Sequence, residues 1–240
     1  MLNGEKMFCS NGARADWVVV WATVDPALGR DGHRAFVVER GTPGFRVARI
    51  ENKMGLVAYE SAALVFEDCC VPAANLLGGE AAYRERSGFK GAMESFNATR
   101  PIVAAMAIGI AQAAYDRAME FVRSIRPRSR VSPWYRRALD KLAWMERKIV
   151  SGRMLCWRAA YLADTRQPNI LEASMAKAYC PQIAQEVTSL AMEILGDLGA
   201  TKDGLVETWF RDVKAMDIVE GTGQIQRRII SRLLTGLSET

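Results

Sequence analysis

The spacing of apolar residues divides the chain into an early part typical of β-strands and a later part typical of helices. Before residue 80, short apolar or alternating runs are separated by turn-forming residues. These runs cover residues 16–23, 35–39, 45–50 and 62–66. Because they follow one another through short links, we expect an antiparallel sheet or a small barrel rather than alternating strands and helices.

From residue 81 onward, the apolar residues recur at helical spacing. Helices are predicted over residues 93–122, 133–163, 169–195, 205–216 and 222–234. Pro133 suits a first helical turn, whereas Pro101 predicts an early break or a helix start inside the first of these stretches. The sequence therefore predicts an α+β fold, with a β-domain over residues 1–80 and a C-terminal helical bundle over residues 81–240.

The rest of the chain is organised around residues 217–232, which read D-I-V-E-G-T-G-Q-I-Q-R-R-I-I-S-R. Glu220 precedes a glycine-containing turn, and Thr222 is a suitable N-cap for a helix that begins near it. We expect this helix to pack through its apolar residues, with polar residues on the opposite side. The apolar set is Ile225, Ile229, Ile230, Leu233 and Leu234, and the polar set is Gln226, Arg227 and Arg228.

Two interpretations of Glu220 follow from these residues alone. Its apolar neighbours Ile218 and Val219 would make the carboxylate a stronger base. Alternatively, Glu220 is an ordinary acid that accepts hydrogen bonds at a helix N-terminus. The free amides of that terminus would also suit a phosphate group.

Composition narrows the class of protein. Half of the 240 residues are apolar and a quarter are charged, no apolar run approaches a membrane span, and the N-terminus is unlike a signal peptide, so we expect a cytoplasmic globular protein without a membrane span. The 5 cysteines lack zinc spacing and are interpreted as reduced core thiols. The single histidine, His33, argues against a His-rich metal site and against a Ser-His-Asp triad.

The chain has a small net positive charge, and several of its arginines are concentrated in one segment. A net charge of +5 favours an anionic ligand such as a nucleotide, and no nucleic-acid partner is expected, because stacking aromatics do not alternate with the basic residues. Residues 123–137 hold several arginines and no acid. This segment is either a solvated interhelical loop, or an anion site or subunit contact.

Taken together, motifs along nearly the whole chain resemble the acyl-CoA dehydrogenase flavoproteins. The opening L-N-G-E-K-M-F-C-S-N-G-A-R-A-D-W is similar to that family's flavin-contacting strand, and N-K-M-G and V-F-E-D-C are similar to its later β-domain strands. Residues 88–112 resemble its first C-terminal helix. The motifs W-F-R-D-V-K and V-E-G-T-G-Q-I-Q-R complete the likeness.

The resemblance implies oxidation of an acyl-CoA thioester to its 2-enoyl-CoA. Glu220 would remove the α-proton, while the β-hydrogen passes as hydride to N5 of FAD. The implied FAD contacts are Phe8, Cys9, Ser10, Thr222 and Gln224, and the implied substrate contacts are Asn97, Arg100 and the Gly221 backbone. Without the resemblance, Phe8 would be interpreted as a core aromatic, Arg100 as part of a structural ion pair and Gln224 as a helix-surface residue.

The resemblance further implies an electron-transfer flavoprotein as electron acceptor and a homo- or hetero-tetramer.

Several departures from the family's sequence pattern leave a second function open, that of a non-catalytic subunit that binds acyl-CoA or scaffolds an active paralogue. The family's Arg-x-x-Phe-Gly segment is not kept at residues 125–129, and Glu193 and Asp197 stand where the family has an amide and a glycine. The N-terminal helical domain and the T-E-P-x-x-G-S-D loop are also expected to be absent. A third hypothesis is an anion- or nucleic-acid-binding module that uses residues 123–137.

Overall fold

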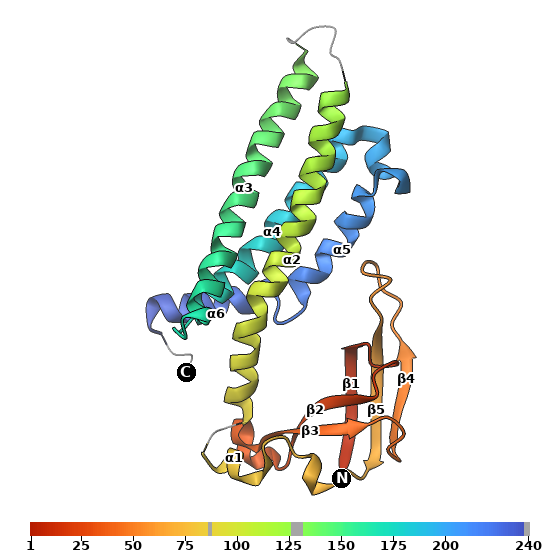
Figure 1. The fold of residues 1–240 in the computed structure, drawn as a ribbon, viewed down its shortest axis with the longest axis vertical. Coiled ribbons are helices and arrows are strands. Elements are labelled where there is room, and N and C mark those ends of the chain that lie inside the picture. The colour runs from red at the N-terminus through yellow and green to blue at the C-terminus, as the bar shows by residue number, and fades with distance from the viewer. Residues whose placement is uncertain (86–87, 126–131, 238–240) are drawn as a thin grey trace. The chain divides into compact units, whose positions relative to one another are not determined.

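The computed structural model of the chain describes residues 1–85, 88–125 and 132–237. It contains two compact units, Met1–Ser95 and Phe96–Thr240. The first unit holds the strands and the second is a helical bundle (Figure 1). The α+β fold predicted from the sequence is therefore confirmed.

The strands of the first unit form two antiparallel sheets. β1 (Leu2–Ser10), β5 (Ser61–Cys69) and β4 (Phe45–Ile50) make a sheet in the order β1-β5-β4, and β2 (Trp17–Thr23) pairs with β3 (His33–Glu39). The prediction of antiparallel pairing is confirmed. β5 is the central strand, which explains its continuous apolar run: every residue from Ser61 to Phe66 is buried.

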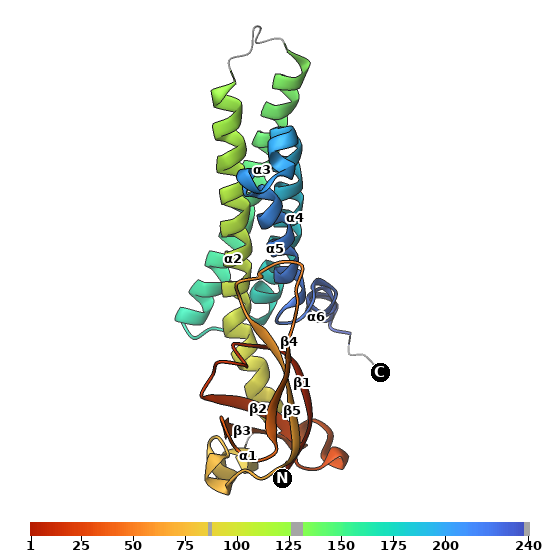
Figure 2. The same ribbon diagram turned by 90° about the vertical axis from the view of Figure 1, so that its right-hand side faces the viewer.

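A small core holds this unit together. It is formed by Leu2, Val18, Val38, Ala62, Leu64, Phe66 and Cys69, and the rings of Phe45 and Phe66 stack with centroids 5.0 Å apart. Two short 3₁₀ helices, η1 (Pro26–Gly32) and η2 (Ala73–Asn75), lie in the connections. Figure 2 shows the two sheets from the side.

Helical residues beyond residue 80 also pack onto the strands. In α1 (Gly79–Glu85), the Tyr83 hydroxyl accepts a hydrogen bond from the Ala35 amide at 3.1 Å. At the start of α2 (Gly88–Ser124), the Phe89 ring lies edge-on to His33 with centroids 5.8 Å apart. These contacts explain why the first compact unit extends to Ser95, and the domain boundary at residue 80 stays a prediction.

The second unit is built around α4 (Ile170–Leu195), which packs against α3 (Pro133–Asp164), α5 (Val206–Ile218) and α6 (Gly223–Thr235). Helices α2 to α5 run alongside one another in both views (Figures 1 and 2). The 3₁₀ helices η3 (Gly196–Ala200) and η4 (Lys202–Gly204) connect α4 to α5. The predicted helices 133–163, 169–195, 205–216 and 222–234 agree with α3 to α6 to within two residues at each end.

The prediction of a break or a start at Pro101 is wrong. α2 begins at Gly88 and continues through Pro101. Proline lacks the amide hydrogen that would bond the carbonyl of Asn97, four residues earlier. That carbonyl instead accepts a hydrogen bond from Nδ2 of Asn169, at 3.4 Å. A neighbouring side chain therefore occupies the carbonyl that proline releases, so the helix need not end there.

Small residues allow the bundle helices to approach closely. A Cβ on Gly152 of α3 would lie 2.4 Å from Cδ1 of Ile108 of α2. The same Cβ would lie 3.3 Å from Sγ of Cys180, and the Sγ atoms of Cys156 and Cys180 are 3.7 Å apart. All 5 cysteines are free thiols, and Cys156, Cys180 and Cys69 are buried as predicted. The core assignment is wrong for Cys70, which is exposed.

No helix among the described residues has both the length and the apolarity that crossing a bilayer requires.

Candidate functional site

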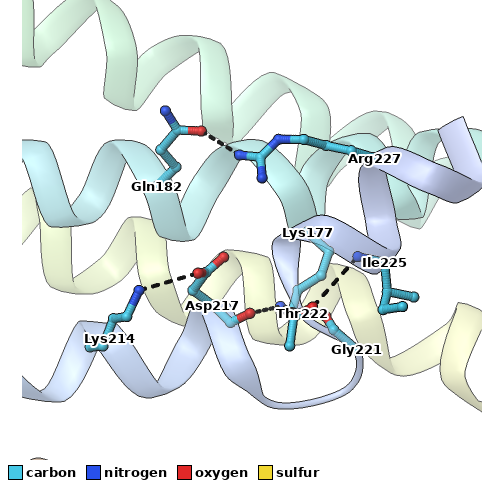
Figure 3. Close-up of polar contacts among 8 residues, drawn as sticks. All are labelled: Lys177, Gln182, Lys214, Asp217, Gly221, Thr222, Ile225 and Arg227. Carbon is cyan, nitrogen blue, oxygen red and sulfur yellow. Dashed lines mark hydrogen bonds and ion pairs between the residues drawn. The ribbon is translucent and has the colours of Figure 1, made fainter. Parts of the chain in front are cut away.

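The turn between α5 and α6 has an unusual backbone. Glu220 has a φ of +55° and Gly221 has a φ of +93°. α6 begins immediately afterwards, and the Thr222 hydroxyl accepts a hydrogen bond from the Ile225 amide at 3.5 Å (Figure 3). The predicted N-cap is therefore confirmed. A left-handed conformation is strained for a residue such as glutamate, and such strain persists only where the surroundings hold it in place.

The Glu220 carboxylate is half-buried and faces α2. The hydroxyl of Thr99 donates a hydrogen bond to Oε2 of Glu220 at 2.7 Å, although the two residues are 121 positions apart in the sequence. A charge-assisted bond of this length is among the stronger hydrogen bonds in proteins. It holds one carboxylate oxygen in a defined position.

Three side chains bind the backbone of the same turn. Nε2 of Gln226 donates to the carbonyls of Glu220 at 3.3 Å and Gly221 at 3.1 Å. Nε of Arg100 lies 3.5 Å from the Glu220 carbonyl. Nζ of Lys177 donates to the carbonyls of Gly221 at 3.2 Å and Asp217 at 3.4 Å. All three donors are buried.

Gly221 is required by this packing. A Cβ at that position would lie 2.6 Å from Nε2 of Gln226, and the φ of +93° disfavours any L side chain. The turn is therefore fixed both by its own backbone and by the side chain that donates to it.

Two cations, Lys177 and Arg100, and two acids, Asp217 and Glu220, interact electrostatically at the turn between α5 and α6. Burial lowers the pKa of Lys177 to about 8, although the carboxylates of Asp217 and Glu220 act in the opposite direction. Burial also lowers the pKa of Arg100, and the charge of Glu220 opposes this change. The electrostatic cost of placing these cations in the bundle is thus partly offset by the two acids.

The structure brings together several residues predicted from the sequence. Asn97, Arg100, Gly221 and Glu220 lie in one network, in which Nη1 of Arg100 donates to Oδ1 of Asn97 at 2.7 Å. Over the residues that the structure describes, the hydrogen bonds of Arg100 go to the Asn97 side-chain amide and the Glu220 carbonyl, and the carboxylate ion pair of the alternative interpretation is not found. Gln224 is exposed in the first turn of α6, and its role stays a prediction.

The expected packing of α6 is confirmed for Arg227 and Arg228, which are exposed, but it is wrong for Gln226 and for part of the apolar set. Gln226, which was assigned to the polar side, is fully buried, whereas Ile225, Leu233 and Leu234 are 44%, 49% and 64% exposed. The physical reason is that the face of α6 toward the turn must supply donors to the turn's carbonyls, which the Gln226 amide does. The periodicity of apolar residues alone does not reveal that a helix face must supply hydrogen-bond donors to a neighbouring turn.

Sequence reasoning missed Thr99, Lys177 and Gln226. A signal exists for Lys177, because it falls on the apolar stripe of α4 at helical spacing from Ala173, Cys180 and Ala184, all buried. A lysine in that position needs buried acceptors. Thr99 and Gln226 gave no comparable signal, since both residue types are common on helix surfaces.

In the first unit, Phe8, Cys9 and Ser10 end strand β1. Phe8 is 64% exposed, so the interpretation as a core aromatic is wrong. Ser10 is exposed beside it, and burial raises the pKa of the half-buried Cys9 thiol, which keeps it protonated at neutral pH. The strand therefore presents an aromatic ring and a hydroxyl to its surroundings.

The predicted departures from the family's sequence pattern lie in two segments of the chain. Of segment 125–129, residues 126–129 lie outside the described residues, as does much of segment 123–137. Glu193 forms an ion pair with Lys141, and Asp197 is exposed in η3. Over the described residues, no group of three or more His, Cys, Asp or Glu side chains is arranged to hold a metal ion.

Comparison with known proteins gives matches along almost the whole chain. Residues 1–69 match the family model of the acyl-CoA dehydrogenase middle domain, and residues 86–235 match that of the acyl-CoA dehydrogenase C-terminal domain. Acryloyl-CoA reductase (NADH) of Anaerotignum propionicum is 41% identical over 97% of this chain and 58% of its own length.

Solved structures agree with these matches. Butyryl-CoA dehydrogenase from Megasphaera elsdenii superposes with a TM-score of 0.90 and 36% identity, over 98% of this chain and 60% of that one. A chain from a structure described as the electron transferring flavoprotein of Acidaminococcus fermentans gives a TM-score of 0.90 and 40% identity, over 98% and 60% of the two chains. The chain thus spans about 60% of the length of the proteins that it matches.

Proposed function

Because the chain belongs to the acyl-CoA dehydrogenase family, we propose that it carries out α,β-dehydrogenation of an acyl-CoA thioester, with Glu220 as the base that removes the α-proton. The observation that carries this proposal is the hydrogen bond from Thr99 to Oε2 of Glu220 at 2.7 Å, on a turn whose backbone is strained and braced. Strained residues held in this way are concentrated at functional sites.

The geometry suits proton abstraction from carbon. The α-proton of a thioester is only weakly acidic, so the base must be held close to it and sheltered from water. Thr99 engages Oε2, which leaves Oε1 to receive the proton. The Glu220 backbone amide is the proposed donor to the thioester oxygen as enolate charge develops there. Asn97, Arg100 and the Gly221 backbone are the proposed substrate contacts.

FAD is the cofactor that the family implies, and the chain's residues fit it. The exposed Phe8 ring and Ser10 hydroxyl of β1 suit a planar heterocycle, with Cys9 between them. Thr222 and Gln224 lie at the N-terminus of α6, where free amides and the helix dipole suit phosphate oxygens. When bound, FAD supplies the acceptor for the β-hydrogen.

Substrate and partners are proposed from the relatives. The names acryloyl-CoA reductase and butyryl-CoA dehydrogenase support a short acyl chain. The likeness to a chain in an electron transferring flavoprotein structure supports such a protein as electron acceptor. A homo- or hetero-tetramer remains our proposal for the assembly.

A non-catalytic subunit is the second candidate. It is favoured by Asp197, an exposed carboxylate where the family has a glycine near the cofactor pyrophosphate. Two like charges at contact range repel each other by about 1 kcal/mol in water and by more where water is excluded. A purified chain that takes up no FAD in reconstitution would support this candidate.

The test is Glu220→Gln, which keeps the size of the side chain and removes the base. With FAD-reconstituted chain and butyryl-CoA, we expect the rate of flavin bleaching to fall about a thousandfold, as for the loss of a general base. Glu120→Gln is the matched control, because Glu120 is an exposed acid paired with Arg117 on α2. Bleaching by Glu220→Gln at the wild-type rate would overturn the assignment of the base.

A further inference from the structure

Lys177 is a fully buried lysine in the middle of α4. Lysine is among the residues least often buried, because its ammonium group loses hydration that the protein must replace. Among the described residues, both hydrogen bonds of Lys177 go to backbone carbonyls rather than to carboxylates. The side chain is therefore placed to hold backbone.

The two acceptors lie on either side of Glu220. One is the carbonyl of Asp217 in the last turn of α5, at 3.4 Å, and the other is the carbonyl of Gly221, at 3.2 Å (Figure 3). A single atom thus joins the end of α5 to the turn that precedes α6. The ammonium group also lies at the C-terminal end of α5, where the helix dipole favours a positive charge.

The backbone between Asp217 and Gly221 needs stabilising contacts of this kind. Glu220 has a φ of +55°, a conformation that a non-glycine residue does not keep without support. Gln226 binds the carbonyls of Glu220 and Gly221 from α6, so Lys177 and Gln226 hold the turn from two different helices. The charged groups around Lys177 are Asp217 and Glu220, which favour its ammonium form, and Arg100, which opposes it.

We propose that Lys177 is a positioning residue for Glu220: by binding the carbonyls of Asp217 and Gly221, it fixes the backbone from which the Glu220 carboxylate reaches Thr99. The inference rests on the proposed role of Glu220 as base. It assigns Lys177 no contact with substrate or cofactor.

Hydrogen exchange of the 240-residue chain tests the positioning directly. The amides of Val219 and Gln226 flank the turn and are bonded to the carbonyls of Ala215 and Thr222, each at 3.0 Å. Lys177→Met keeps the length of the side chain and removes its donors. We expect exchange at these two amides to become about tenfold faster, the effect of losing a hydrogen bond to a charged group, with exchange at Leu142 and Ile149 in α3 unchanged.

Activity gives the second readout. In FAD-reconstituted chain with butyryl-CoA, Lys177→Met should lower kcat about tenfold with KM within twofold of wild type, because a displaced base affects the chemical step rather than binding. Lys214→Met is the matched control: Lys214 contacts the Asp217 carboxylate at 3.4 Å from a partly exposed position. It should change neither the local exchange nor kcat.

The outcomes are distinguishable. Uniformly faster exchange throughout the bundle, or unchanged exchange and kcat, would overturn the positioning role. If Lys177→Met does not fold, Lys177→Gln, which retains N–H donors on a shorter side chain, should lie between wild type and a tenfold loss, and equality with wild type in both readouts would overturn the proposal. Full turnover by Glu220→Gln would reject only the base, since the exchange data do not depend on it.

Discussion

At the scale of single residues, Lys177 should make folding stability depend on pH in a defined window. Burial lowers its pKa from 10.5 to about 8, so between these values the unfolded chain binds more protons than the folded chain. Stability must then rise with pH across the window. The cost of burying the charge is fully present below pH 8 and disappears above about pH 10.5.

The measurement is urea unfolding of wild type and Lys177→Met at pH 7 to 10.5. The free energy of unfolding of wild type should gain about 3 kcal/mol relative to the variant over this range. The variant provides the reference because every other titrating group is shared. A constant difference between the two proteins would show that Lys177 keeps an ordinary pKa in the fold. Neutral lysine still has two N–H donors, so both of its carbonyl contacts can survive the titration.

The residues of the site were only partly predictable from sequence. Glu220, Thr222 and Gly221 stand in a local pattern of acid, glycine and helix cap, which the sequence displays directly. Thr99 was not predictable, because its bond to Glu220 spans 121 positions and depends on how α2 meets the α5–α6 turn. Such a contact is set by tertiary packing, which local propensity does not describe.

At the scale of elements, α6 buries the side-chain amide of Gln226 and leaves much of its apolar face exposed. Gln226→Leu should lower the free energy of unfolding by about 2 kcal/mol, because the carbonyls of Glu220 and Gly221 lose a buried donor. Leu234→Gln, the reverse change on the exposed face, should stay within about 0.5 kcal/mol of wild type.

Thermal and urea unfolding of the two variants decide the orientation of α6. The opposite order of destabilisation would mean that the apolar face is the packed one, as periodicity alone suggests. The helices themselves were predictable to within two residues for α3 to α6, because their caps and periodicity are local. The continuity of α2 through Pro101 was not, since it depends on the Asn169 side chain from another part of the chain.

At the scale of the whole molecule, the chain holds two compact units, and the helical one contains its own core. Leu142, Met145, Ile183 and Val187 are buried within it. We expect a fragment of residues 96–240 to fold alone, with a helical circular dichroism spectrum and a cooperative transition within about 4 °C of the helical transition of the parent chain. A non-cooperative melt of the fragment would show that the first unit is needed for folding.

The division into a strand-rich part and a helical part was visible in the sequence, because the apolar period changes near residue 80. The position of the junction was less visible. Tyr83 and Phe89 belong to helices yet pack on Ala35 and His33, so secondary structure and compact unit do not change at the same residue.

The positions of the Lys177 acceptors near the end of the chain also determine when the contacts of Lys177 can form during synthesis of the protein. Until residues 217–221 leave the ribosome, Lys177 has none of the backbone acceptors that it has in the finished fold. A nonsense codon upstream of this turn would release a chain with an uncompensated charge in its central helix. We therefore expect such a truncated chain to be less stable than the full chain, because the contacts that Lys177 makes with the Asp217 and Gly221 carbonyls could not form.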